Sequence, residues 1–174
     1  MSAHRRAAIT GAPGAGKSTL LDELARRGHA IAPEVARPIL KRPGGMALRE
    51  ADPLGFAEAM LEAQMRAWET PVRASRVIYD RGFADIAGFL RAEGLAVPAP
   101  IDRACRECRF DGPIFRAPAW RAIYRSDAER IQDWQQALAS DEAVTGAWRD
   151  YGYQLIDLPL LTPARRADFV SARL

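Results

Sequence analysis

The chain has 174 residues, of which 48% are apolar and 27% charged, as in one globular domain with its own hydrophobic core. No apolar run is long enough to cross a bilayer, and the stretch after the N-terminal arginines is too short for a signal-peptide core, so we expect a cytoplasmic protein. The net charge of +3 is too small to indicate a nucleic-acid partner.

Segments of strand character and segments of helical character alternate along the chain. The expected strands are residues 6–10, 29–33, 76–79, 113–118 and 153–159. The expected helices begin at Lys17, near residue 34, at Asp52–Pro53, near residues 83 and 101, near Asp127 and at Thr162–Pro163. This alternation predicts an α/β fold with a mainly parallel five-stranded sheet. Without a repeat or a linker, residues 1–174 form one domain, with a lid-like segment around 118–135.

The first turn between a strand and a helix carries the most specific motif. Residues 11–18, "GAPGAGKS", match G-x-x-x-x-G-K-[ST] at every fixed position. Glycines let the backbone turn its N–H groups toward phosphate oxygens, and the start of the following helix adds its positive end. Lys17 would reach the β- and γ-phosphates, and the Ser18 hydroxyl would bind Mg²⁺. The expected nucleotide-binding residues are Gly11, Ala12, Pro13, Gly14, Ala15, Gly16, Lys17, Ser18 and Thr19.

Two carboxylates follow strands whose carboxyl ends should meet at this loop. Asp80 lies at the end of the third expected strand, where it would help to hold Mg²⁺. Its alternative role is to cap the next helix. Glu34 follows the second strand and is our candidate for the group that accepts a proton from a substrate hydroxyl or orients a water. Its alternative role is a surface ion pair with Arg37.

The neighbours of these carboxylates are candidates for binding the second substrate. Arg37 shares a helix face with Glu34, and Arg81 follows Asp80 directly. Asp85 lies in the first turn of the next helix, where compensation of the helix dipole is an equally good explanation. We therefore expect Glu34, Arg37, Arg81 and Asp85 to face the substrate.

A third group of charges lies in "WRAIYRSDAER", residues 120–130. Arg121, Arg125 and Arg130 on a closing segment would stabilise the charge of a transferring phosphoryl group and exclude water. The alternative is a solvated basic face on a helix. Trp120 could stack on a base or ribose, although packing in the core is the simpler explanation.

Four blocks together resemble a known family. "ITGAPGAGKSTLLDELARRGHAIAPEVAR", "IYDRGFADIAGFL", "APAWRAIYRSDAERIQDW" and "YGYQLIDLP…RADFV" are similar to small AAA-domain-like P-loop ATP-binding proteins of the ribosylnicotinamide-kinase-like branch. The resemblance implies a three-layer α/β/α P-loop fold that binds ATP, or GTP in its place, with Mg²⁺. It implies phosphate contacts from Gly11 to Thr19, a metal contact at Asp80 and lid arginines within 121–130. The "DRG" of residues 80–82 resembles the Asp-Arg motif of thymidylate-type kinases, where the pair faces the acceptor.

These observations lead to one preferred function and two alternatives. We expect a Mg²⁺-dependent kinase that transfers the γ-phosphoryl group of ATP to a hydroxyl or phosphate of an unknown small molecule. In this view Lys17, Glu34, Asp80, Arg121, Arg125 and Arg130 are catalytic, and Ser18 and Asp80 hold the metal. The alternatives are an ATP- or GTP-binding regulatory or trafficking module with slow NTPase activity, and a kinase of nucleic-acid ends. The chain would act as a monomer or a homodimer.

Overall fold

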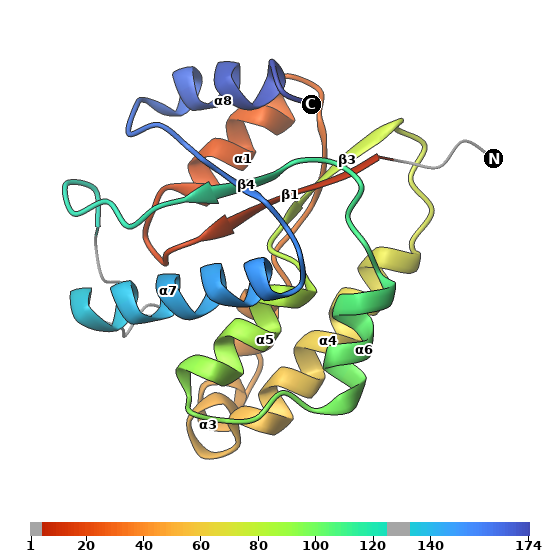
Figure 1. The fold of residues 1–174 in the computed structure, drawn as a ribbon, viewed down its shortest axis with the longest axis vertical. Helices are drawn as coiled ribbons and strands as arrows, with labels where there is room; N and C mark the ends of the chain where they lie inside the picture. Colours follow the sequence, from red (N-terminus) through yellow and green to blue (C-terminus); the bar gives the residue numbers. More distant parts are fainter. Residues whose placement is uncertain (1–4, 125–132) are drawn as a thin grey trace.

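The computed structural model, which describes residues 5–124 and 133–174, has a five-stranded sheet between two layers of helices (Figure 1). The strands are all parallel, in the order β2-β3-β1-β4-β5. Their bounds are β1 (Arg5–Gly11), β2 (Ala30–Ala32), β3 (Arg76–Asp80), β4 (Ile114–Ala117) and β5 (Leu155–Asp157). The predicted three-layer α/β/α fold is thereby confirmed.

Eight helices accompany the strands within the described residues. Their bounds are α1 (Lys17–Arg26), α2 (Ala36–Leu40), α3 (Gly45–Ala51), α4 (Pro53–Glu69), α5 (Phe83–Ala92), α6 (Ala99–Glu107), α7 (Trp134–Asp150) and α8 (Pro163–Ser171). Figure 1 shows α1 and α8 on one face of the sheet and α4, α5, α6 and α7 on the other. Each face of the sheet has its own apolar cluster, which is why the strands read as buried apolar runs.

The local signals in the sequence account for several of the helix ends. Asp52 caps α4 by accepting a hydrogen bond from the backbone N–H of Gly55 at 2.9 Å, with Pro53 as the first helical residue. Gly28, directly after the C-cap of α1, has φ of +90°, which glycine adopts without steric cost. Thr162 caps α8 in the predicted way.

One helix was not expected, and another is described only in part. The predicted helix start near Asp127 lies outside the described residues; within them α7 begins at Trp134, where Asp133 and Gln136 form a reciprocal capping box. The short helix α3 was not predicted, and the glycine pair at its start, Gly44–Gly45, is a pattern typical of a turn. Gly45 permits a close approach: a Cβ atom on it would lie 2.1 Å from the carbonyl oxygen of Ile39.

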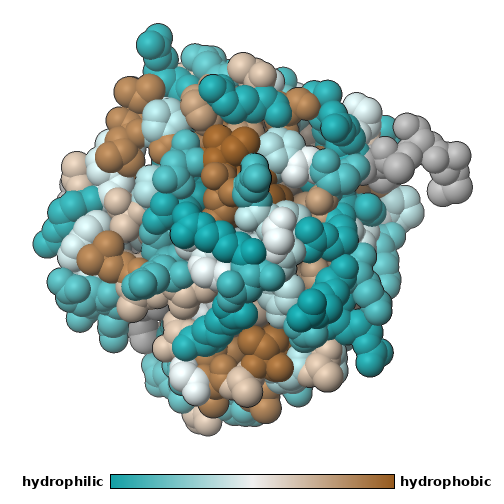
Figure 2. All heavy atoms as spheres, viewed as in Figure 1, coloured by the Kyte–Doolittle hydropathy of each residue, from teal (hydrophilic) through white to brown (hydrophobic). Residues whose placement is uncertain are grey.

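The surface seen in Figure 2 is hydrophilic over much of its area, and apolar side chains gather there in separate patches. Among residues 5–124 and 133–174, the large apolar residues that stay exposed are Leu54, Leu95, Ile123, Leu138, Leu160 and Leu161. Among the described residues, no helix is both long and apolar enough to span a membrane.

On one face of the sheet, α5 and α7 approach each other closely. A Cβ atom on Gly88 would lie 2.5 Å from the Cα of Val144, so the two backbones meet where no side chain fits. We expect Gly88→Ala to lower the free energy of unfolding, measured in urea, by about 1–3 kcal/mol because the helices must separate.

The matched control is Gly146→Ala, in the middle of α7. A Cβ atom there would meet nothing within 4 Å, so alanine should raise the free energy of unfolding by up to about 1 kcal/mol through its higher helix propensity. Equal effects of the two substitutions on unfolding would contradict the close approach of α5 and α7.

Candidate active site

The phosphate loop joins β1 to α1 at the carboxyl edge of the sheet. Gly14 and Gly16 have φ of +71° and +77°, the left-handed conformation that favours glycine, and Gly16 is one of the two glycines that the motif fixes. Gly11, with φ of +117°, lies so close to β4 that a Cβ atom would be 2.2 Å from the carbonyl oxygen of Ala117. The first and last glycines of the motif are therefore required by the backbone itself, as the sequence pattern predicts.

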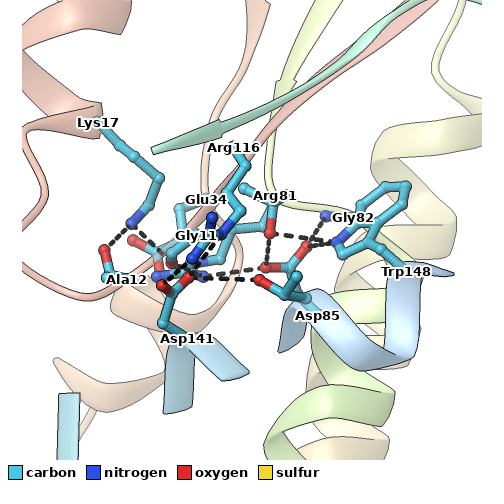
Figure 3. A network of polar contacts seen from close by, with 12 residues as sticks. Gly11, Ala12, Lys17, Glu34, Arg81, Gly82, Asp85, Arg116, Asp141 and Trp148 are labelled. Atoms are coloured by element: carbon cyan, nitrogen blue, oxygen red, sulfur yellow. Dashed lines mark hydrogen bonds and ion pairs between the residues drawn. The ribbon is translucent and has the colours of Figure 1, made fainter. Parts of the chain in front are cut away.

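Lys17 is folded back onto the loop. Its Nζ donates to the carbonyl oxygens of Gly11 at 3.1 Å and Ala12 at 2.5 Å (Figure 3). The side chain is buried, and burial together with the charge of Arg81 lowers the pKa of Lys17 to about 7. The ammonium group is thus held where phosphate oxygens would take the place of the two carbonyls.

Asp80 ends β3 beside this loop with one unpaired oxygen. Its Oδ1 is buried and has no hydrogen-bond partner within the described part of the chain, so the capping role considered for this residue is not the one it plays. Burial, and next the nearby charge of Glu34, raises the pKa of Asp80 to about 6. A buried carboxylate with a free oxygen suits a divalent cation, and Ser18 lines the same cavity.

Arg81 occupies the centre of a polar network at the carboxyl edge. Its backbone adopts φ of +72°, a value uncommon for a residue other than glycine. Its backbone N–H donates to the carbonyl oxygen of Ile9 in β1 at 2.9 Å. The guanidinium then donates to the carboxylates of Glu34 at 3.3 Å and Asp85 at 3.0 Å. Although burial opposes the charged form, these carboxylates raise the pKa of Arg81, which stays a cation at any working pH.

Glu34 faces Arg81 from the loop after β2. Burial favours the neutral acid, but the charges of Arg81, Lys17 and Arg37 outweigh it and lower the pKa of Glu34 below its ordinary value. Glu34 is therefore ionised at neutral pH. Its principal partner is Arg81 and not the Arg37 of the predicted surface pair, although Arg37 also lines the cavity.

Asp85 has a positioning role that the sequence did not disclose. Its carboxylate accepts hydrogen bonds from Thr10 Oγ1 at 2.6 Å, the backbone N–H of Gly82 at 2.9 Å, Trp148 Nε1 at 3.0 Å and Arg81 Nη1 at 3.0 Å (Figure 3). The residue is in the first turn of α5, as expected, and it is buried. Asp85 holds Arg81 toward the cavity; direct contact with substrate stays a prediction.

The lid residues fall into two groups. Arg121 is exposed, and its guanidinium lies 5.2 Å from the ring centroid of Trp134, outside the lining of the cavity. Arg125 and Arg130 lie outside the described residues. Trp120 does line the cavity, beside Ile123, so its position agrees better with the stacking alternative than with packing in the core.

Arg166, on α8, is a site residue that the sequence reasoning missed. It is 2% exposed and donates from Nη1 to the carbonyl oxygen of Ala15 in the phosphate loop at 2.8 Å. Its Nε and Nη2 are buried without a hydrogen-bond partner among the described residues, its guanidinium lies 5.7 Å from the ring centroid of Trp120, and burial lowers its pKa. One signal was available: an arginine in the first turn of a helix opposes the helix dipole and so needs another reason to be there.

One cavity of about 650 Å³ is lined by the phosphate loop, by Glu34, Asp80, Arg81 and Asp85, and by Arg166. One part of its wall is the phosphate loop, together with Trp120, Pro163 and Arg166. Another part is apolar and comes from α4, α5 and α7. Among the described residues no cluster of three or more His, Cys, Asp or Glu side chains could hold a metal alone. Mg²⁺ does not require one, since it keeps several waters and is bound through one or two carboxylates plus phosphates.

Known proteins agree with this architecture. The deoxyadenosine kinase from M. mycoides with bound dATP superposes with a TM-score of 0.73 at 16% identity, over 96% of this chain and 97% of that one. The shikimate kinase from Acinetobacter baumannii in complex with shikimate gives 0.64 at 16% identity, over 98% and 92%. The NadR protein in complex with NR gives 0.67 at 17% identity, over 98% of this chain and 51% of that one.

At such identities these likenesses establish the fold alone. Among curated proteins, none matches the chain. A family model described as AAA domain matches residues 6–166, which is most of the chain and includes the phosphate loop, Glu34, Asp80 and Arg166. The chain therefore belongs to this AAA domain family, as a small P-loop protein with a nucleotide-kinase-like fold.

Proposed function

We propose that the protein is a Mg²⁺-dependent kinase that transfers the γ-phosphoryl group of ATP to a hydroxyl or phosphate of a small molecule. The observation that carries the proposal is that one cavity of about 650 Å³ is lined both by the phosphate loop and by an apolar wall of α4, α5 and α7. A protein that only binds or hydrolyses a nucleotide needs no room beside the phosphates for a second substrate. A kinase must hold donor and acceptor together in one cavity.

Each group of residues lining the cavity would have its own role in phosphoryl transfer. Backbone N–H groups of residues 11–19 and the ammonium of Lys17 bind the phosphates of ATP. Ser18 and the free oxygen of Asp80 would hold Mg²⁺, which would supply charge neutralisation at the phosphates. Arg81, held by Asp85 and Glu34, is directed to the transferring group or the acceptor. Arg121, Arg125 and Arg130 on the closing segment would stabilise the charge of the transition state and exclude water.

Glu34 is the proposed proton acceptor of the reaction. Its ionised carboxylate accepts the proton of the attacking hydroxyl as the new bond to the γ-phosphorus forms and the bond to the β-phosphate oxygen breaks, leaving ADP. Because the neighbouring cations keep Glu34 ionised, the residue is ready to orient this hydroxyl at neutral pH.

The decisive test of the proposal is an acceptor screen. ATP consumption is measured alone and with nucleosides, nucleoside monophosphates, nicotinamide riboside and aminoglycoside-like alcohols, with product detection by mass spectrometry. At least one acceptor should stimulate turnover and appear phosphorylated. Tight nucleotide binding with no stimulated turnover in any case would overturn the kinase assignment in favour of a regulatory or trafficking module.

Glu34→Gln tests the proposed proton acceptor. We expect transfer to fall roughly 10²- to 10⁴-fold, because a carboxamide cannot take the proton, while nucleotide affinity changes by no more than about threefold. The control is Glu142→Gln, at an exposed position of α7, which should leave both quantities unchanged. Unchanged transfer in Glu34→Gln would remove Glu34 from the mechanism.

The pH dependence of nucleotide binding tests the state of Lys17. Phosphates favour the ammonium form, but the free protein has a Lys17 pKa of about 7, so above this pH binding must take up a proton. Affinity should therefore be greatest below about pH 7 and should fall, by up to about tenfold per unit, as pH rises above it.

The control for this pH dependence is Lys17→Arg, whose guanidinium stays charged throughout the range. Titration calorimetry in two buffers of different ionisation enthalpy measures the protons taken up at pH 8. Titration of the nucleotide itself is common to both proteins, so equal proton uptake by the two would rule out the lowered pKa of Lys17.

A further inference from the structure

One cation at the wall of the cavity is buried without an anion beside it. Arg166 lies in the first turn of α8, which packs beside α1 on one face of the sheet (Figure 1). Its Nη1 donates to the carbonyl oxygen of Ala15, but its Nε and Nη2 have no hydrogen-bond partner among the described residues. Burial lowers the pKa of Arg166, and no carboxylate of residues 5–124 and 133–174 raises it. The side chain nevertheless lines the cavity.

Such a position is costly for the free protein. Removing a guanidinium from water without a counter-charge is unfavourable, and the positive end of α8 adds repulsion. Arg81, by contrast, donates to the carboxylates of Glu34 and Asp85. The hydrogen bond to Ala15 engages one nitrogen of Arg166 and leaves the other two unexplained. The missing partner is therefore an anion that enters the cavity.

An aromatic ring provides part of the compensation. Trp120 lies over the guanidinium of Arg166, with 5.7 Å from the guanidinium carbon to the ring centroid, and it lines the same cavity. A cation–π contact at this distance is weak and leaves the N–H groups without acceptors. A phosphate would supply both the charge and the oxygens.

The place where Arg166 meets the phosphate loop indicates which phosphate this is. Lys17 contacts the first residues of the loop, on the side of Asp80, where the proposed transfer takes place. Arg166 meets the other half of the loop, at Ala15 and Gly16: a Cβ atom on Gly16 would lie 3.0 Å from Nη1 of Arg166. A phosphate on that side is farther from the reacting end of the nucleotide.

We infer that Arg166 binds the α-phosphate of the donor nucleotide through Nε and Nη2. These two nitrogens share one edge of the planar guanidinium, and their N–H groups are spaced to meet two oxygens of one phosphate. The residue lies outside the phosphate-loop motif and reaches the nucleotide from the last helix of the chain. This inference rests on the proposed function, since its ligand is the proposed donor.

The test measures the affinity for ADP by titration calorimetry. In Arg166→Met, ADP should bind about 10- to 100-fold more weakly than in the wild-type protein, because two charge-assisted hydrogen bonds are lost. The control is Arg165→Met, which removes the exposed neighbouring arginine of α8. Its affinity for ADP should stay within about threefold of the wild-type value, since exposed charges contribute little.

Phosphorothioates distinguish a contact with phosphate from a purely structural role. In ADPαS, sulfur replaces one oxygen of the α-phosphate, and a chelator in the buffer removes any effect of sulfur on metal binding. At least one of the two diastereomers should bind the wild-type protein about five- to twentyfold more weakly than ADP, because sulfur accepts hydrogen bonds poorly. In Arg166→Met this difference should shrink to about twofold or less, whereas loss of a structural support would weaken all three ligands alike.

A second variant covers the case in which Arg166→Met does not fold. Arg166→Lys keeps the charge but not the planar pair of donors, so it should lose the same discrimination between ADP and ADPαS. Three results would overturn the inference. They are an ADP affinity that does not depend on Arg166, a wild-type protein that binds both diastereomers as tightly as ADP, and discrimination that survives the substitution of Arg166.

The outcomes separate this inference from the kinase assignment. Phosphoryl transfer to an acceptor, together with an ADP affinity that does not depend on Arg166, would overturn the role of Arg166 and leave the kinase function standing. ADP binding that depends on Arg166, with no transfer to any acceptor, would support the contact with the α-phosphate and overturn the kinase function.

Discussion

The carboxylate of Asp85 is the point at which the sheet and the helices of one face are joined. It accepts hydrogen bonds from β1 through Thr10, from the turn after β3 through Arg81 and Gly82, and from α7 through Trp148. Trp148 also donates to Thr10 Oγ1 at 3.1 Å, which closes the network. Buried polar networks of this kind define one arrangement only if every member is satisfied. The position of Arg81, and hence of Glu34, follows from this network.

The architecture follows from signals that are local in the sequence. Apolar runs of strand length alternate with helical patterns, and capping residues such as Asp52 and Thr162 mark where helices begin. Two helices show the limits of such signals. The capping box expected at 126–129 lies outside the described residues, and within them α7 begins at Trp134, where Asp133 and Gln136 form a capping box. α3 was missed because a glycine pair that serves as a turn also permits close packing on α2.

The site was predictable to the extent that it depends on motifs and on the ends of strands. The phosphate loop, Glu34 and Asp80 lie where the carboxyl edge of a parallel sheet must place them. Arg166 could not be found in the same way. Its significance comes from its burial, with Nε and Nη2 left without hydrogen-bond partners among the described residues, and burial depends on which distant segments pack against it.

The near contact between Gly88 and Val144 has a consequence for how the protein can change over evolution. α5 and α7 approach each other so closely that neither can shift without opening the core. The walls that these helices give to the apolar part of the cavity are therefore fixed in shape. Substitutions on α4, at Phe56, Met60 and Gln64, can change the opposite part of the lining and leave the α5–α7 contact intact. The fold thus separates a rigid frame from a wall that substitutions can alter, while the phosphate loop stays the same.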